Sequence, residues 1–78
     1  MKDSIKETLY RVVNERLRYY KLSAYKTLFH EYLLIIEYGS AGNKKPTGLI
    51  QEYFSSKEKL IQKRSQIIEQ KKKKGYRQ

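Results

Sequence analysis

The spacing of apolar residues changes once along this chain of 78 residues, and this change limits the fold more than any other feature. In residues 57–74 the apolar side chains recur with helical spacing, whereas between residues 19 and 54 they alternate with a period of two. A sheet must cover its apolar face, and the chain offers only one long amphipathic helix for this purpose. The sequence therefore predicts an α+β fold, in which a small antiparallel sheet of about four strands packs against the C-terminal helix.

The helix predicted over residues 57–74 has a signal at each end. Ser55 followed by Glu58 matches a capping box at its start. At its end, Lys71 to Lys74 place cations beside the negative pole of the helix dipole, and Gly75 can adopt the left-handed conformation that closes a last turn. The predicted apolar stripe consists of Leu60, Ile61, Ile67 and Ile68, with Arg64 on the same side.

Three strands are predicted upstream of this helix, over residues 19–25, 32–38 and 49–54. A short connection at 27–30, with His30 as a turn residue, pairs the first two as a hairpin, and the glycine-containing segment 39–48 is a loop. The N-terminal segment is ambiguous. Its apolar residues fit a helix from Ile5 to Val13, while residues 9–13 alone fit an edge strand, and periodicity leaves both open.

Positive charge is the strongest functional signal. Eighteen Lys and Arg residues against eight Asp and Glu residues give a net charge of +10. Residues 55–78 carry +7 of this, and residues 1–54 carry +3. Such a chain is expected to bind a polyanion.

The residue inventory argues against most catalytic and metal-binding chemistries. The absence of Cys excludes a disulfide, a thiolate zinc site and a Cys nucleophile, and one His cannot form a site with several His ligands. Ser and Glu residues show no nucleophile–base spacing, so neither an enzyme nor a cofactor is expected. The sequence has no apolar window of membrane-spanning length and no signal peptide, so we expect a cytoplasmic protein that does not bind membranes. A chain of this length forms one domain, residues 1–78, and we expect it to be a monomer.

Five short segments occur in a distinctive order: Tyr10-Arg11-Val12, Arg18-Tyr19-Tyr20-Lys21-Leu22, Leu28-Phe29, Tyr38-Gly39-Ser40-Ala41-Gly42 and Lys73-Lys74-Gly75-Tyr76. In order and spacing they resemble the WGR domain, over residues 7–77. The resemblance favours residues 8–13 as a first strand. WGR domains occur in poly(ADP-ribose) polymerases, where they help recognise DNA breaks and relay that binding to the catalytic region, and also in small bacterial proteins. The resemblance thus implies a DNA-binding module.

The triplet that names the family is only partly kept. Tyr38 stands where the family has Trp, so a flat ring able to stack on a sugar or base is retained. Gly39 is unchanged. Ser40 replaces the Arg that reaches nucleic acid in DNA-bound family members, which removes a charge and a bidentate donor.

These observations predict a nucleic-acid site that contacts mainly phosphates, with DNA favoured over RNA and weak sequence selectivity.

Among the tyrosines, Tyr38 and Tyr76 are expected to be exposed, and Tyr20, Tyr32 and Tyr53 to pack in the core or as cross-strand pairs. The alternative function is an adaptor that docks on an acidic protein through its basic helix, or on another chain through a sheet edge. The predicted site residues are Tyr38, Gly39, Ser40, Lys44, Lys45, Lys63, Lys71, Lys72, Lys73 and Lys74.

Overall fold

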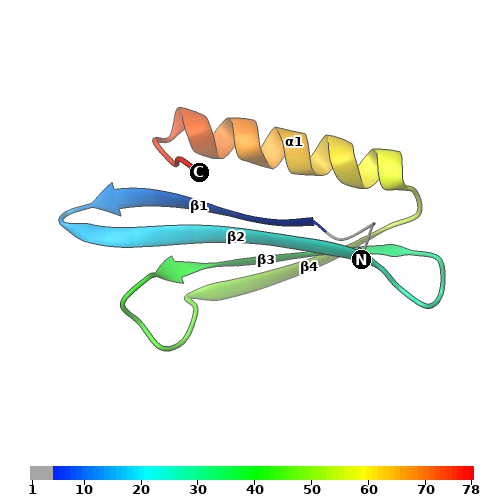
Figure 1. Cartoon of the computed structure of the whole chain (residues 1–78), viewed down its shortest axis with the longest axis horizontal. Helices are drawn as coiled ribbons and strands as arrows, with labels where there is room; N and C mark the ends of the chain where they lie inside the picture. Colours follow the sequence, from blue (N-terminus) through cyan, green and yellow to red (C-terminus); the bar gives the residue numbers. More distant parts are fainter. Residues whose placement is uncertain (1–4) are drawn as a thin grey trace.

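Four strands and one helix follow one another in the computed structural model, which describes residues 5–78 (Figure 1). The sheet has the order β1-β2-β3-β4, and each strand is antiparallel to its neighbours. Helix α1 lies along one face of this sheet (Figure 1). The predicted α+β fold, with four strands and a C-terminal helix, is confirmed, although residues 1–4 of the expected domain lie outside the described residues. The elements are β1 (Ile5–Val13), β2 (Arg16–Lys26), β3 (Tyr32–Ser40), β4 (Gly48–Phe54) and α1 (Lys57–Lys73).

The core lies between α1 and the sheet. Leu9 is opposite Tyr20 across β1 and β2, and Tyr20 is opposite Tyr38 across β2 and β3, so alternate residues of every strand point toward the helix. Each strand therefore has a core face and an open face. The buried cluster consists of Leu9, Tyr20, Leu22, Ala24, Leu34, Ile36, Leu60, Ile67 and Ile68.

The ambiguous N-terminal segment is strand β1, as the family resemblance favoured. It pairs with β2 along its whole length. The two strands are joined by Asn14 and Glu15, whose φ angles of 51° and 66° are those of a tight hairpin turn that matches the twist of the strands. Pairing with β2 decides between helix and strand because it satisfies the backbone groups of β1 that point toward β2, and periodicity within the segment carries no information about that partner.

Two details of the predicted helix are wrong. The N-cap is Ser56, whose side chain accepts a hydrogen bond from the Lys59 amide at 3.3 Å, so Ser55 and Glu58 do not form the capping box. Ile61 is 41% exposed because it lies at the margin of the buried stripe. Within residues 5–78, no helix is both long enough and apolar enough to span a bilayer.

The C-terminal end of α1 closes as the sequence predicts and then returns to the sheet. Gly75 has a φ of 103°, and the amides of Gly75 and Tyr76 donate to the carbonyls of Lys72 and Lys71 at 3.1 and 3.0 Å, which is a Schellman motif. Arg77 then forms two backbone hydrogen bonds with Tyr10 of β1, at 2.7 and 2.8 Å. This return fixes the residues after the helix against the sheet.

Candidate nucleic-acid interface

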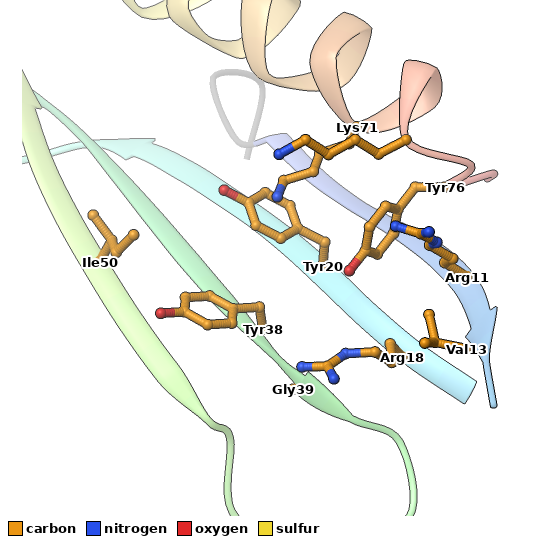
Figure 2. A pocket seen from close by; sticks show the side chains of 10 residues that line it. Arg11, Val13, Arg18, Tyr20, Tyr38, Gly39, Ile50, Lys71 and Tyr76 are labelled. Carbon is orange, nitrogen blue, oxygen red and sulfur yellow. The ribbon is translucent and has the colours of Figure 1, made fainter. Parts of the chain in front are cut away.

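A pocket of about 540 Å³ lies between the C-terminal end of α1 and the core face of the sheet (Figure 2). All four strands and the C-terminal end of the helix contribute lining residues to it. The strands continue beyond the apolar core at this end of the sheet, so residues on their core face line the pocket there. Its lining residues are Arg11, Val13, Arg18, Tyr20, Tyr38, Gly39, Ile50, Lys71, Lys74 and Tyr76.

Three tyrosine rings form one wall of this pocket. The ring centroids of Tyr20 and Tyr38 are 6.0 Å apart with an interplanar angle of 21°, and Tyr76 meets Tyr20 edge-on at 6.1 Å. Tyr20 is almost fully buried, whereas Tyr38 and Tyr76 are half-buried and pack against the core. The expectation that Tyr38 and Tyr76 are exposed is therefore wrong, although both remain accessible from the pocket.

Lys71 is held over two of these rings. Its Nζ atom lies 4.4 Å from the centroid of Tyr20 and 5.5 Å from that of Tyr76. Figure 2 shows that Lys71, Tyr20 and Tyr76 line the same pocket. Burial lowers the pKa of Lys71 below its ordinary value, and the charges of Lys74 and Arg11 lower it further. Burial also raises the pKa of the Tyr20 phenol, which keeps this ring neutral.

A second pocket, of about 560 Å³, adjoins the first, because Val13 and Arg18 line both. It lies at the end of the sheet where β1 turns into β2 and where β3 ends, and it adds Arg16 and the polar residues Ser40, Asn43 and Thr47. We call the two pockets together the basic groove. It is lined by five cationic side chains and no carboxylate, which makes it an electropositive surface. The five are Arg11, Arg16, Arg18, Lys71 and Lys74.

Two glycines make room for this arrangement. Gly48 is opposite Tyr38, and a Cβ at Gly48 would lie only 2.3 Å from the Tyr38 hydroxyl, so the ring lies across β4 where a side chain is missing. A Cβ at Gly39 would lie 2.8 Å from the backbone nitrogen of Thr47. Gly39 therefore permits the close approach of the chain that enters β4.

Arg18 is directly opposite Ser40 in the β2–β3 register. It is half-buried and lines both pockets. The guanidinium that the resemblance placed at position 40 is therefore absent from β3, while another guanidinium occupies the neighbouring position on β2. Figure 2 shows the Arg18 side chain extending toward β3 beside Gly39.

The structure brings together half of the predicted site residues. Tyr38, Gly39, Lys71 and Lys74 line the first pocket, and Ser40 lines the second. The other five do not line the basic groove. Lys44 and Lys45 are exposed in the loop between β3 and β4, and the remaining three lie on α1; the five are Lys44, Lys45, Lys63, Lys72 and Lys73.

Sequence reasoning missed three arginines and the inward tyrosine of the site. Arg11 follows Leu9 by two residues, and Arg18 precedes Tyr20 by two, so each lies on the core face of its strand. The period of two contains this signal once the core face is known. The prediction instead favoured the basic segment at the end of the helix, because its lysines are consecutive in the sequence. The missed residues are Arg11, Arg16, Arg18 and Tyr20.

Comparisons with known proteins identify the family. Neither the curated proteins nor the solved structures gave a significant match. Among the described residues, no group of three or more His, Cys, Asp or Glu side chains is placed to hold a metal ion. A family model described as the WGR domain matches residues 6–78, nearly the whole chain. WGR domains are non-catalytic modules, known in poly(ADP-ribose) polymerases for binding DNA breaks. This chain belongs to the WGR domain family.

Proposed function

We propose that this protein is a non-catalytic nucleic-acid-binding module, with DNA as its ligand, and that the basic groove is its binding site. The observation that carries the proposal is the lining of the groove, where five cations and three tyrosine rings occur without a carboxylate. Cations bind the phosphates, and accessible rings offer a surface for a sugar or base. Family membership supports the choice of DNA. The residues 1–78 act as one module in this proposal.

The two pockets have different roles. In the first, the half-buried ring of Tyr38 shares the pocket lining with Arg18 and Lys74, so a nucleotide that stacks on this ring places its phosphate in the same pocket as these cations. The second pocket has Arg16 and polar side chains but no aromatic residue, which suits a neighbouring phosphate. Contacts of this kind give weak sequence selectivity because none reads a base edge.

Arg18 takes the place of the arginine that this chain lacks at position 40. The two positions are cross-strand neighbours on the same face of the sheet, so a guanidinium on β2 can reach the same phosphate. Arg18 also retains the fork of donors that binds a phosphate through two hydrogen bonds, which Ser40 cannot provide. The altered triplet is thus compatible with nucleic-acid binding.

The test is fluorescence anisotropy with a labelled DNA duplex over a range of salt concentrations. With four to five phosphates neutralised, log K should fall against log salt with a slope of about −4. Arg18→Gln should make the slope shallower by about 1. Lys21→Gln is the matched control, since Lys21 is on β2 but on the open face. A slope near zero for the unaltered protein, or equal effects of the two variants, would contradict the proposal.

The role of Tyr38 is tested by the form of the ligand. Tyr38→Ala should weaken binding to single strands and duplex ends more than binding to a closed circular duplex, because only unpaired or terminal nucleotides expose a face to the ring. If the protein instead retains partners from a nuclease-treated lysate and binds no DNA, the adaptor function replaces this proposal.

A further inference from the structure

The open face of the sheet, which points away from α1, has the composition of a protein interface. The strands place sixteen residues on this face, and only Lys6, Lys21 and Glu37 are charged, in a chain with 33% charged residues. Depletion of charge together with tyrosine enrichment is typical of the buried centre of an interface. Four of the eight tyrosines lie here: Tyr10, Tyr19, Tyr25 and Tyr53.

Large exposed apolar residues concentrate on the same side. The described residues include ten large apolar side chains that are exposed. Six of them lie on the open face of the sheet, and two more, Leu28 and Phe29, lie in the turn between β2 and β3. Leu28 is 94% exposed and Phe29 is 82% exposed. Together with Tyr25, Leu33 and Tyr53 they line a hollow of about 720 Å³ at this end of the sheet. Lys26, Thr27 and Glu31 also line the hollow. A concentration of exposed apolar residues rimmed by polar ones is typical of a protein-interaction site.

We propose that the open face binds the open face of a second copy of this chain, forming a two-fold dimer. Charge is the first argument. The face carries a net charge of +1 on a molecule of +10, and Lys21 and Glu37 are direct cross-strand neighbours. Two copies that meet through this face therefore bring few like charges into direct contact, whereas the basic groove lies between α1 and the opposite face of the sheet, away from the proposed interface. An acidic partner would instead be attracted to the groove.

Area is the second argument. Strands of about nine residues extend about 30 Å, and four strands are about 19 Å wide, so each copy offers nearly 600 Å² before side-chain relief is counted. Two copies whose faces meet over their whole extent bury about 1,100 Å², which exceeds the roughly 1,000 Å² expected of a biological interface. A two-fold axis uses the same patch on both partners, so a neutral apolar face meets an equally neutral apolar face.

The test is sedimentation velocity of the full chain without nucleic acid, at concentrations up to about 200 µM and in salt from about 0.05 to 0.5 M. The expected result is a dimer whose affinity is unchanged or higher at high salt, because salt screens the repulsion between two cationic bodies. Nucleic-acid binding changes in the opposite direction with salt, so failure of one proposal does not imply failure of the other. A chain that remains monomeric in every condition would overturn the dimer.

Variants locate the interface. Leu49→Lys and Tyr53→Lys change exposed open-face residues, 54% and 57% accessible, and each should weaken the dimer at least about tenfold. Ile61→Lys adds the same charge on the helix side, at a residue 41% exposed, and should leave dimerisation unchanged. Circular dichroism and thermal unfolding establish that each variant folds. A dimer that resists both open-face variants, or is weakened equally by the Ile61 variant, would show that this face is not the interface.

Discussion

Lys71 combines a role in the groove with a shifted pKa. It contributes a cation to the groove, but burial against Tyr20 and Tyr76, with Lys74 and Arg11 nearby, lowers its pKa. A bound phosphate favours the protonated amine and so raises this pKa in the complex. Binding above the lowered pKa therefore requires proton uptake, and the affinity for DNA should fall as pH rises through it, before an ordinary lysine at 10.5 titrates.

The measurement is DNA affinity by anisotropy from about pH 7 to pH 10 for the unaltered protein and for Lys71→Arg, since arginine stays protonated throughout this range. The unaltered protein should lose several-fold more affinity than the variant. The other titratable groups of the groove are present in both proteins, so their contributions cancel in this comparison. Parallel pH profiles would show that Lys71 does not bind the phosphate.

Glu7 and Arg64 form the ion pair that joins β1 to α1. The Nε atom of Arg64 donates to Glu7 at 2.6 Å and its second nitrogen donates to the other carboxylate oxygen. These hydrogen bonds lower the pKa of Glu7 below its ordinary 4.5. The stabilisation is therefore present above pH 4.5 and is lost as pH falls through the lowered value.

Glu7→Gln should lower the free energy of unfolding by about 1 kcal/mol at pH 7, because the pair is bidentate but partly exposed. The difference from the unaltered protein should shrink as pH falls below 4.5. Urea denaturation at neutral and acidic pH measures both values. Glu69→Gln removes an exposed carboxylate from the same helix and serves as the control. A cost that does not depend on pH would exclude this linkage.

Among the elements, those with a regular pattern were predictable and those defined by long-range contacts were not. The period of two revealed β2, β3 and β4, and helical spacing with terminal signals revealed α1. β1 stayed ambiguous until its pairing with β2 was known. The groove was predictable only in part, because strand register places Arg11 opposite Arg18 and Arg18 opposite Ser40, and so brings both arginines into the pocket that Tyr38 lines. A short connection predicted that β2 and β3 are neighbours, but no local pattern specified the partner of β1 or the register that aligns the groove residues.

The C-terminal cap links the stability of α1 to the shape of the groove. Gly75→Ala should lower the free energy of unfolding by about 1 kcal/mol, because a side chain is strained at a φ of 103°. It should also weaken DNA binding, since the cap places Tyr76 against Tyr20 and Lys71. Urea denaturation and anisotropy measure the two effects. Gly42→Ala is the matched control, because a Cβ there meets nothing within 4 Å and Gly42 has no positive φ. Equal behaviour of both variants would contradict this role of the cap.

At the scale of the whole molecule, the two faces of the sheet divide the chemistry. The helix side holds the basic groove, and the open side is nearly neutral and apolar. The contribution of a cation to DNA binding is therefore expected to depend on where it lies in the fold. In the proposed complex a cation in the groove contacts the phosphate directly, whereas Lys44 and Lys45, which do not line the groove, act through the long-range field, which salt screens over about 8 to 10 Å.

Two charge-matched double variants separate local contacts from net charge. Arg18→Glu with Lys74→Glu, and Lys44→Glu with Lys45→Glu, each lower the net charge from +10 to +6. The groove pair should weaken DNA binding about fiftyfold or more and make the salt dependence shallower by about 2, whereas the loop pair should weaken it only several-fold with almost the same slope. Salt-titrated anisotropy measures both, after circular dichroism has shown that the variants fold. If the two pairs weaken binding equally, net charge rather than the basic groove governs the interaction, because the groove would then contribute nothing beyond its share of the field.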